Sequence, residues 1–255
     1  MISTFEGKVL SNKKICCDCY ELKFEWKKTA DVPVPGQFFT VGNLEGVFLR
    51  RPFAFSNFDE KKKIATMIFQ KRGKGTEDLT TKKRKDYLNI FGPLGEKLFP
   101  MPDKGQESLL IAGGIGLGPL LFLAHRIYKI KSPITFIFGC RIKDFIPSNL
   151  SSFKPIICTD DGSKGFKGTI GDYLKSDKNI ITDNTVIYAC GPKPVLKSCH
   201  EFAIQHNCEC FVSAEQIIAC GIGACLGCAI PSSHGGYVRV CTDGPVFNSK
   251  DLKWE

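Results

Sequence analysis

The chain has 255 residues, of which 43% are hydrophobic and 24% charged. This composition is ordinary for a globular protein and excludes wholesale disorder and fibrous repeats. The length predicts two compact units with a small appendage, because a domain averages about 150 residues. The longest apolar run, residues 109–124, contains four glycines and a proline. It is shorter than the roughly 20 residues that cross a bilayer. The first eight residues lack the apolar core of a signal peptide, so we expect a cytoplasmic protein without a membrane partner.

The charge is unevenly distributed. Thirty-five basic and 26 acidic residues give a net charge of +9, and residues 61–85 alone hold ten Lys or Arg against two acidic residues. The basic residues form three clusters, Lys61–Lys63, Lys71–Lys74 and Lys82–Lys85. A nucleic-acid-binding protein would place such charge on a helix face or among stacking aromatics. We therefore interpret the clusters mainly as solvated hairpin tips and expect no nucleic-acid partner.

Strands are expected over the first hundred residues. Leu22, Phe24 and Trp26 alternate with charged residues, which is typical of a strand with one buried face. Residues 48–56 and 64–69 are further strand candidates. Short strands separated by turn signals predict an antiparallel β-barrel over residues 1–104.

From about residue 105, apolar strands alternate with helices. The expected strands are 109–112, 134–138, 155–159 and 185–189, and the expected helices are 119–130, 170–175 and 195–206. This alternation predicts a doubly wound parallel α/β sheet over residues 105–212. The remaining residues, 213–255, are rich in Cys and Gly and predict a small segment that a metal centre organises.

Thirteen cysteines are many for a cytoplasmic chain. Because disulfides are disfavoured in that compartment, clustered thiols indicate metal ligands. Cys220, Cys225, Cys228 and Cys241 have the spacing C-x4-C-x2-C-x12-C, whose opening is that of plant-type 2Fe–2S sites. They are interleaved with Gly221, Gly223 and Gly227. We expect these glycines to let backbone amides approach the sulfurs. A zinc site is the main alternative, although structural zinc usually has two short C-x2-C pairs.

Two glycine-rich turns follow strands of the predicted sheet. The first contains Gly113, Gly114, Gly116 and Gly118 and precedes a helix. Glycines let a pyrophosphate approach the backbone, and a helix N-terminus favours negative charge, so this turn indicates a dinucleotide site. It departs from G-x-G-x-x-G, and close packing is the alternative. The second turn, Cys190-Gly191-Pro192, is expected to reach the same crevice at the carboxyl edge of the sheet.

The barrel half carries two further motifs. In Arg51-Pro52-Phe53-Ala54, the arginine offers a fork for phosphate and the phenylalanine a flat face for a ring system. Gly75-Thr76 offers an amide and a hydroxyl to another phosphate oxygen. The alternative is a strand followed by a hairpin turn.

Taken together with 92–95 and 241–247, these motifs resemble the electron-transfer subunits of dihydroorotate dehydrogenase B, within the ferredoxin–NADP reductase superfamily. The resemblance covers nearly the whole chain. It implies that FAD binds the barrel, NAD the α/β domain, and a 2Fe–2S cluster the four cysteines. It places the FAD contacts at Arg51, Pro52, Phe53, Ala54, Ile68, Phe69, Gln70, Gly75 and Thr76. Ala54 and Gln70 stand where the family often has Ser and Arg, and Lys71 or Arg72 could replace the missing charge.

The resemblance also implies a function. Flavin exchanges electrons both with nicotinamide, two at a time, and with a cluster, one at a time. The implied partner is an FMN-containing catalytic subunit that oxidises dihydroorotate to orotate, in a heterotetramer, so no catalytic side chain is expected here. Two alternatives remain. One is a subunit of a sulfide dehydrogenase, a hydrogenase or a ferredoxin-dependent transhydrogenase. The other is a zinc-stabilised, basic nucleic-acid-binding module.

Overall fold

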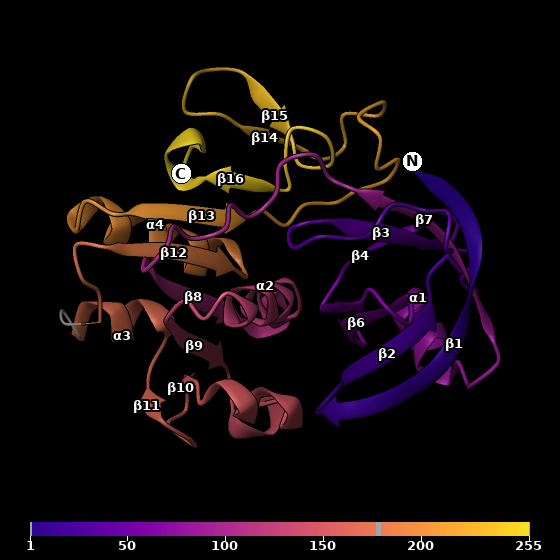
Figure 1. Ribbon diagram of the computed structural model, residues 1–255, viewed down its shortest axis with the longest axis horizontal. Helices are drawn as coiled ribbons and strands as arrows, with labels where there is room; N and C mark the ends of the chain where they lie inside the picture. Colours follow the sequence, from indigo (N-terminus) through magenta and orange to yellow (C-terminus); the bar gives the residue numbers. More distant parts are fainter. Residues whose placement is uncertain (1, 177–179, 255) are drawn as a thin grey trace.

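Two seven-stranded sheets lie side by side, and the C-terminal segment lies across one end of both (Figure 1). The computed structural model describes residues 2–176 and 180–254. Along the first sheet the strand order is β4-β3-β7-β1-β2-β6-β5. Along the second it is β11-β10-β9-β8-β12-β13-β16, and β14 and β15 pair by themselves.

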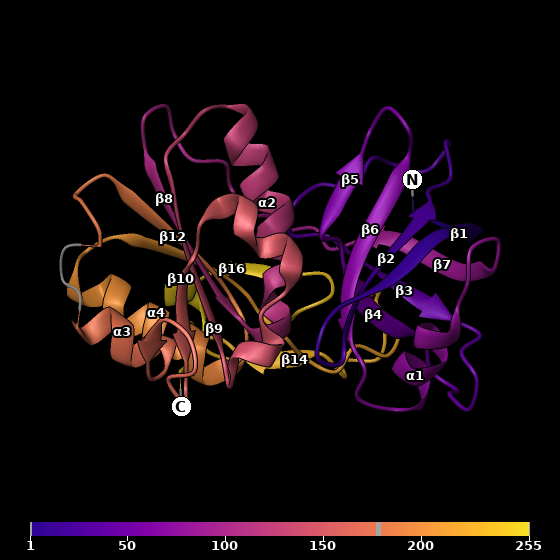
Figure 2. The same ribbon diagram turned by 90° about the horizontal axis from the view of Figure 1, so that it is seen from below.

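The first sheet is an antiparallel barrel. Its elements are β1 (Ser3–Cys16), β2 (Cys19–Glu25), β3 (Phe38–Gly42), β4 (Arg51–Ala54), β5 (Asn57–Asp59), β6 (Ile64–Gln70), α1 (Lys74–Thr81) and β7 (Tyr87–Leu94). Every strand pairing among its described residues is antiparallel, and β4 also lies close to β6, so the sheet curls round until its two ends meet (Figure 2). Leu22 and Phe24 are fully buried in its core while Glu25 is exposed. The predicted barrel is therefore confirmed.

The second sheet begins at residue 107. Its elements are β8 (Glu107–Gly113), η1 (Gly114–Gly116), α2 (Leu117–Lys129), β9 (Ile134–Cys140), η2 (Lys143–Phe145), η3 (Ser148–Phe153), β10 (Ile156–Thr159), β11 (Phe166–Lys167), α3 (Ile170–Ser176), β12 (Thr185–Cys190), α4 (Lys193–Gln205) and β13 (Glu209–Ser213). These six strands pair in parallel. The last elements are β14 (Ala229–Pro231), β15 (Tyr237–Arg239), β16 (Val246–Asn248) and η4 (Ser249–Asp251).

Helices cover both faces of the second sheet. Leu110 of β8 packs in one hydrophobic cluster with Leu120 of α2. Its neighbour Leu109 packs in another cluster with Leu196 and Phe202 of α4. Because successive strand residues point to opposite faces, both faces of β8 are buried. This confirms the predicted doubly wound parallel sheet, with one addition: β16 returns from the C-terminal segment and pairs antiparallel with β13.

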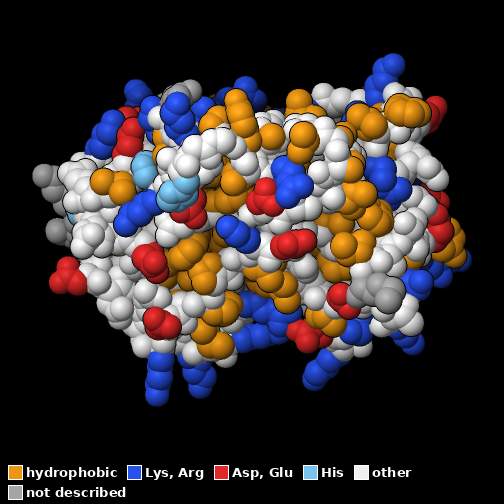
Figure 3. Space-filling view, turned by 90° about the horizontal axis from the view of Figure 1, so that it is seen from above, with side chains coloured by type: hydrophobic (Ala, Val, Ile, Leu, Met, Phe, Trp, Pro, Cys, Tyr) orange, Lys and Arg blue, Asp and Glu red, His pale blue; other side chains and the backbone are white. Residues whose placement is uncertain are grey.

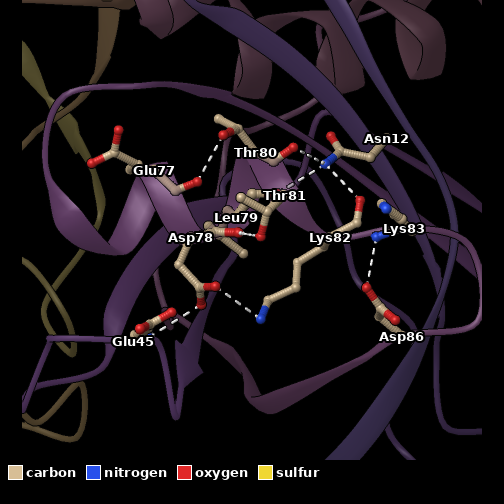
Figure 4. A network of polar contacts seen from close by, with 10 residues as sticks. All are labelled: Asn12, Glu45, Glu77, Asp78, Leu79, Thr80, Thr81, Lys82, Lys83 and Asp86. Carbon is tan, nitrogen blue, oxygen red and sulfur yellow. Dashed lines mark hydrogen bonds and ion pairs between the residues drawn. The ribbon is translucent and has the colours of Figure 1, made fainter.

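Three details of the barrel half differ from the sequence prediction. The strand expected over 48–56 is only β4, and Phe48 is 100% exposed in the preceding loop. Residues 57–59, which lie between the two strand candidates, form the additional strand β5. Residues 74–81 form helix α1 instead of part of a hairpin turn. Asn12 of β1 anchors the end of this helix, because its amide donates to the carbonyl oxygens of Leu79 (2.8 Å) and Lys82 (3.0 Å) (Figure 4).

The basic clusters were only partly predicted. Lys61–Lys63 lies in the turn between β5 and β6, as expected of a hairpin tip. The other two clusters flank α1, and members of each form ion pairs. Lys71 pairs with Glu77 at 2.8 Å, and Lys82 pairs with Asp78 at 3.0 Å (Figure 4). In the described part of the chain, no helix is both long enough and apolar enough to span a membrane.

A close backbone contact joins the turn after β8 to the end of β12. A Cβ atom built on Gly116 would lie 2.2 Å from the carbonyl oxygen of Cys190, whereas one built on Gly118 meets nothing closer than 3.8 Å. We predict that Gly116→Ala lowers the free energy of unfolding by about 1–3 kcal/mol, because backbone cannot move aside as a side chain can. Gly118→Ala, two residues on within α2, is the control. It should be neutral or stabilising by up to about 1 kcal/mol. Chemical denaturation measures both, and equal stability of the two variants would contradict the contact.

Candidate cofactor and metal site

A cavity of about 260 Å³ lies where the barrel, the second sheet and the C-terminal segment meet. Eight residues singled out from the sequence line it: Pro52, Phe53, Ala54, Ile68, Phe69, Gln70, Gly116 and Cys190. Most of the wall is apolar, and polar groups lie at a few points, as in small-molecule sites generally. Residues of three sequence motifs, 51–54, 113–118 and 190–192, therefore lie at one site.

The other three predicted barrel residues lie outside the cavity wall. The Arg51 guanidinium donates to the carbonyl oxygen of Leu49 at 3.1 Å, and a Cβ built on Gly75 would lie 3.5 Å from the Arg51 side chain. The Thr76 hydroxyl accepts from the amides of Arg72 (2.8 Å) and Gly73 (3.1 Å). It thus closes the first turn of α1, and its contact to a phosphate stays a prediction.

Arg72 is the single cation among the residues that line the cavity, within the described chain. Its Nε donates to Gln70 Oε1 at 2.8 Å, so the two side chains lie together. The adjacent Lys71 is engaged elsewhere: its hydrogen bond and ion pair with Glu77 raise the pKa of Lys71. Of the two cations considered from the sequence, Arg72 is the one that faces the cavity.

The two glycine-rich turns pack against each other at the carboxyl ends of β8 and β12. A Cβ on Gly113 would lie 3.1 Å from Pro192, and one on Gly191 would lie 3.0 Å from Gly113. Gly191 also has a φ of +156°. Gly114 has a φ of +53°, and a Cβ built there meets nothing within 4 Å. Packing thus accounts for Gly113 and Gly191, whereas Gly114 leaves its backbone open to a ligand.

Cys190 contributes a neutral thiol to the cavity wall. Burial, aided by the Glu215 carboxylate, raises the pKa of Cys190 to about 12, although a hydrogen bond with Ser213 acts in the opposite direction. The side chain therefore shapes the cavity and does not act as a nucleophile at neutral pH.

Sequence reasoning missed the part of the cavity wall that the C-terminal segment supplies. These residues are Ser213, Ala214, Glu215, Gln216, Ile218, Val240 and Pro245. Pro245 belongs to the 241–247 motif, but nothing in the sequence placed it or the others at the cavity, because their position depends on the return of the chain beside β13. Their closeness to the cysteine motif was the one available signal.

The four predicted metal-ligating cysteines form two pairs. The thiol of Cys228 donates to Cys241 Sγ at 3.2 Å, and the side chains of Cys220 and Cys225 hydrogen-bond to each other. Among residues 2–176 and 180–254, no group of three or more His, Cys, Asp or Glu side chains is placed to hold a single metal ion. Two pairs suit a centre with two irons, each taking two thiolates, and suit a tetrahedral zinc ion less well.

Backbone amides of the thiol loop, residues 220–228, point at the sulfurs. Burial acts to raise the pKa of Cys220, but hydrogen bonds, including those from the amides of Ile222 and Cys225, outweigh it and lower the pKa to about 6. Burial and the neighbouring Cys228 raise the pKa of Cys241 to about 11, and the amide of Gly223 opposes them. Such donors favour thiolates, the form that binds iron.

The backbone conformation of the thiol loop agrees with the prediction at two glycines of three. Gly221 and Gly223 have φ values of +75° and +81°. Beside Gly227, it is Leu226 that takes the left-handed conformation, with a φ of +58°. The amide of Gly227 donates to Cys225 Sγ at 3.4 Å, so close backbone approach holds there without positive φ.

Comparison with known proteins identifies the family. The family model described as the iron–sulfur cluster binding domain of dihydroorotate dehydrogenase B matches residues 215–253. The dihydroorotate dehydrogenase B (NAD(+)) electron transfer subunit of Caldanaerobacter subterraneus is 37% identical over 251 residues, which are 97% of each chain. That of Desulforamulus reducens is 35% identical over the full length of both. The chain belongs to this family.

Solved structures share the fold of this chain. An NADH-dependent reduced ferredoxin-NADP oxidoreductase superposes with a TM-score of 0.86 at 25% identity, over 97% of this chain and 90% of that one. A ferredoxin NADP+ reductase from Neisseria gonorrhoeae gives a TM-score of 0.67 at 15% identity, over 80% and 91%. The second likeness concerns the fold alone. The predicted family and fold class are confirmed.

Proposed function

We propose that this chain is the electron-transfer subunit of a dihydroorotate dehydrogenase B. In this function it passes electrons from the FMN of a dihydroorotate-oxidising catalytic subunit, through a 2Fe–2S cluster and FAD, to NAD. Dihydroorotate and NAD⁺ thereby become orotate, NADH and a proton, a step of pyrimidine biosynthesis. Dihydroorotate itself would bind to the partner.

The observation that carries the proposal is the shared wall between the cavity and the thiol loop. Ile218 lies two residues before Cys220, and Val240 lies directly before Cys241, and both line the cavity. A ring system in the cavity and a cluster on the thiols would thus contact neighbouring residues of the same two segments. This arrangement supports direct electron transfer between the two cofactors.

The cavity wall fits a flavin. Phe53 and Phe69 offer flat apolar faces, and Gln70 with Arg72 forms a polar end suited to phosphate. Bound FAD supplies the exchange between two-electron nicotinamide chemistry and one-electron cluster chemistry. The protein holds the ring, excludes water through its apolar wall and keeps the Cys190 thiol neutral.

We place NAD on the second sheet, at the two packed turns. The contacts proposed are Gly113, Gly114, Gly116, Gly118, Cys190, Gly191 and Pro192. The open backbone at Gly114, just before the start of α2, supports an approach by pyrophosphate. Residues 1–104, 105–212 and 213–255 would then be the FAD, NAD and cluster regions. The division of strands between the sheets supports this assignment, although β16 joins the second sheet.

An exposed apolar surface around the thiol loop supports docking of the partner. Ile217, Ile222 and Leu226 are 75%, 54% and 62% exposed, and Figure 3 shows hydrophobic side chains spread over one face of the molecule. Exposed apolar side chains that gather on one face mark interaction sites. We place the FMN-containing subunit of a heterotetramer there.

All thirteen cysteines lie in the described residues and none forms a disulfide, which supports a cytoplasmic location.

A second candidate function follows from the solved structure with the TM-score of 0.86, which comes from a flavin-based electron-bifurcating oxidoreductase. A subunit of a ferredoxin-dependent transhydrogenase would use the same cavity and thiol loop with another partner. Identification of the protein that co-purifies with this chain separates the two functions. The paired thiols and the family membership leave no support for the zinc-binding nucleic-acid module.

The cluster assignment is tested by Cys225→Ser. Cys225 is exposed, so the change removes a ligand without removing packing. We predict at least a severalfold loss of iron and of the electron paramagnetic resonance (EPR) signal of the reduced cluster, with FAD content retained. Cys17→Ser, in the turn between β1 and β2, is the control and should keep both cofactors. Wild-type iron content in the Cys225 variant would exclude Cys225 as a ligand.

The flavin assignment is tested by Arg72→Gln. We predict about a tenfold weaker affinity for FAD, because a charge-assisted hydrogen bond contributes about 1.5–3 kcal/mol and Arg72 is exposed enough for solvent to weaken it. Lys71→Gln removes the same charge one residue away and should leave the affinity within about twofold. The double variant Gln70→Arg, Arg72→Gln should recover affinity. Flavin fluorescence titration measures all three, and equal effects of the two single variants would refute the specific role of Arg72.

The docking surface is tested by Ile217→Asp. A buried, unpaired carboxylate at the interface should weaken binding of the catalytic subunit at least tenfold, because central apolar positions commonly contribute more than about 1 kcal/mol. Tyr128→Asp is the control, since Tyr128 is 72% exposed on α2. Co-purification and binding affinity measure the effect, with iron and FAD contents confirming that both variants are loaded. Undiminished binding by the Ile217 variant would place the interface elsewhere.

A further inference from the structure

A charged pair closes the turn that carries Cys241. Arg239 lies at the end of β15, and its guanidinium binds the Asp243 carboxylate through both oxygens: Nε to Oδ2 at 3.2 Å and Nη2 to Oδ1 at 3.0 Å. The Arg239 amide also donates to Asp243 Oδ2 at 2.8 Å, and the Asp243 amide donates back to the Arg239 carbonyl oxygen at 2.8 Å. Cys241 lies midway in this closed turn.

The same guanidinium reaches the thiol loop. Arg239 Nη1 donates to the carbonyl oxygen of Gly223 at 3.4 Å, and a Cβ built on Gly223 would lie 3.1 Å from Nη1. The amide of Gly223 in turn donates to the Cys241 thiol. Arg239 therefore joins the segment between Cys220 and Cys225 to the turn that holds the fourth ligand.

The positive end of the pair lies close to the sulfurs. Arg239 lies opposite Ala229 in the pairing of β14 with β15, so it is next to Cys228 and two residues before Cys241. A cation at this position favours every additional negative charge on the thiol-bound centre, and a carboxylate disfavours it. The pair is partly exposed, so its effect is moderated by solvent but not abolished.

We propose that Arg239 and Asp243 form a charged clamp that sets the reduction potential of the iron–sulfur centre while it holds Cys241 against the thiol loop. This inference rests on the proposed function, because it presumes a cluster on the four thiols. Reduction adds one negative charge to the cluster. Arg239 stabilises the reduced form and raises the potential, whereas Asp243 lowers it. Both act as positioning residues and bind no iron.

The experiment is a redox titration of the FAD- and cluster-loaded chain, monitored by EPR. Arg239→Gln should shift the midpoint potential of the cluster to more negative values, and Asp243→Asn should shift it to more positive values. Arg239→Lys keeps the charge and should restore most of the wild-type potential, and the Arg239→Gln, Asp243→Asn double variant should lie between the singles. The control is Arg126→Gln, which breaks another arginine–carboxylate pair, with Glu60, and should leave the potential unchanged.

The outcomes separate the inference from the function on which it rests. Opposite shifts of the midpoint potential in the two single variants support the clamp. A merely structural role would lower the iron content of both variants and would not shift their potentials in opposite directions. Unmoved potentials, or shifts in the same direction, with intact EPR signals overturn the clamp alone. If Arg239→Gln fails to assemble the cluster, the sign of the Asp243→Asn shift decides. A wild-type chain that binds zinc and no iron, and that gives no 2Fe–2S signal, overturns the proposed function itself.

Discussion

The arrangement of the whole site depends on the backbone pairing of one short stretch, residues 244–248. On the barrel side, the amides of Glu96 and Lys97 both donate to the carbonyl oxygen of Gly244 at 3.0 Å. On the other side, Ala214 donates to the carbonyl oxygen of Pro245 at 2.9 Å, and β16 continues as an edge strand beside β13. These bonds hold the barrel, the second sheet and the cysteine segment together. The cavity exists because this stretch joins all three.

The thiol loop illustrates how backbone geometry can offset the cost of gathering negative charge. Four thiolates near one another repel, and burial disfavours each of them. Backbone amides of the loop offset this cost, because left-handed φ values at Gly221, Gly223 and Leu226 turn N–H groups toward the sulfurs. The balance differs between the pairs. Cys220, near the surface, has a lowered pKa, whereas buried Cys241 has a raised one and lies beside the Arg239 side chain.

Features with local causes were predictable from the sequence, and features that depend on the return of the chain were not. The alternation at Leu22 and Phe24 predicted a barrel strand. The spacing of the four cysteines predicted a 2Fe–2S site, and the structure adds that their thiols form two pairs. Helix α1 was missed because Gly-Lys-Gly-Thr has turn chemistry, and because the Asn12 side chain that binds carbonyl oxygens at the end of the helix lies 62 residues before the start of α1. Likewise, no sequence pattern within residues 213–218 indicates that this segment lines a cavity opposite Phe53 and Ile68.

The loop after β6 shows how a missing charge can be replaced without a change of fold. Residues two apart on an extended chain point to the same side, so a cation at position 72 reaches the region that one at position 70 would occupy. Here Gln70 takes the nearer place and accepts a hydrogen bond from Arg72, which orients the guanidinium along the cavity wall. Lys71 points to the other side and pairs with Glu77 of α1. The order Gln-Lys-Arg therefore matters more than the number of charges, because alternation decides which cation faces the cavity.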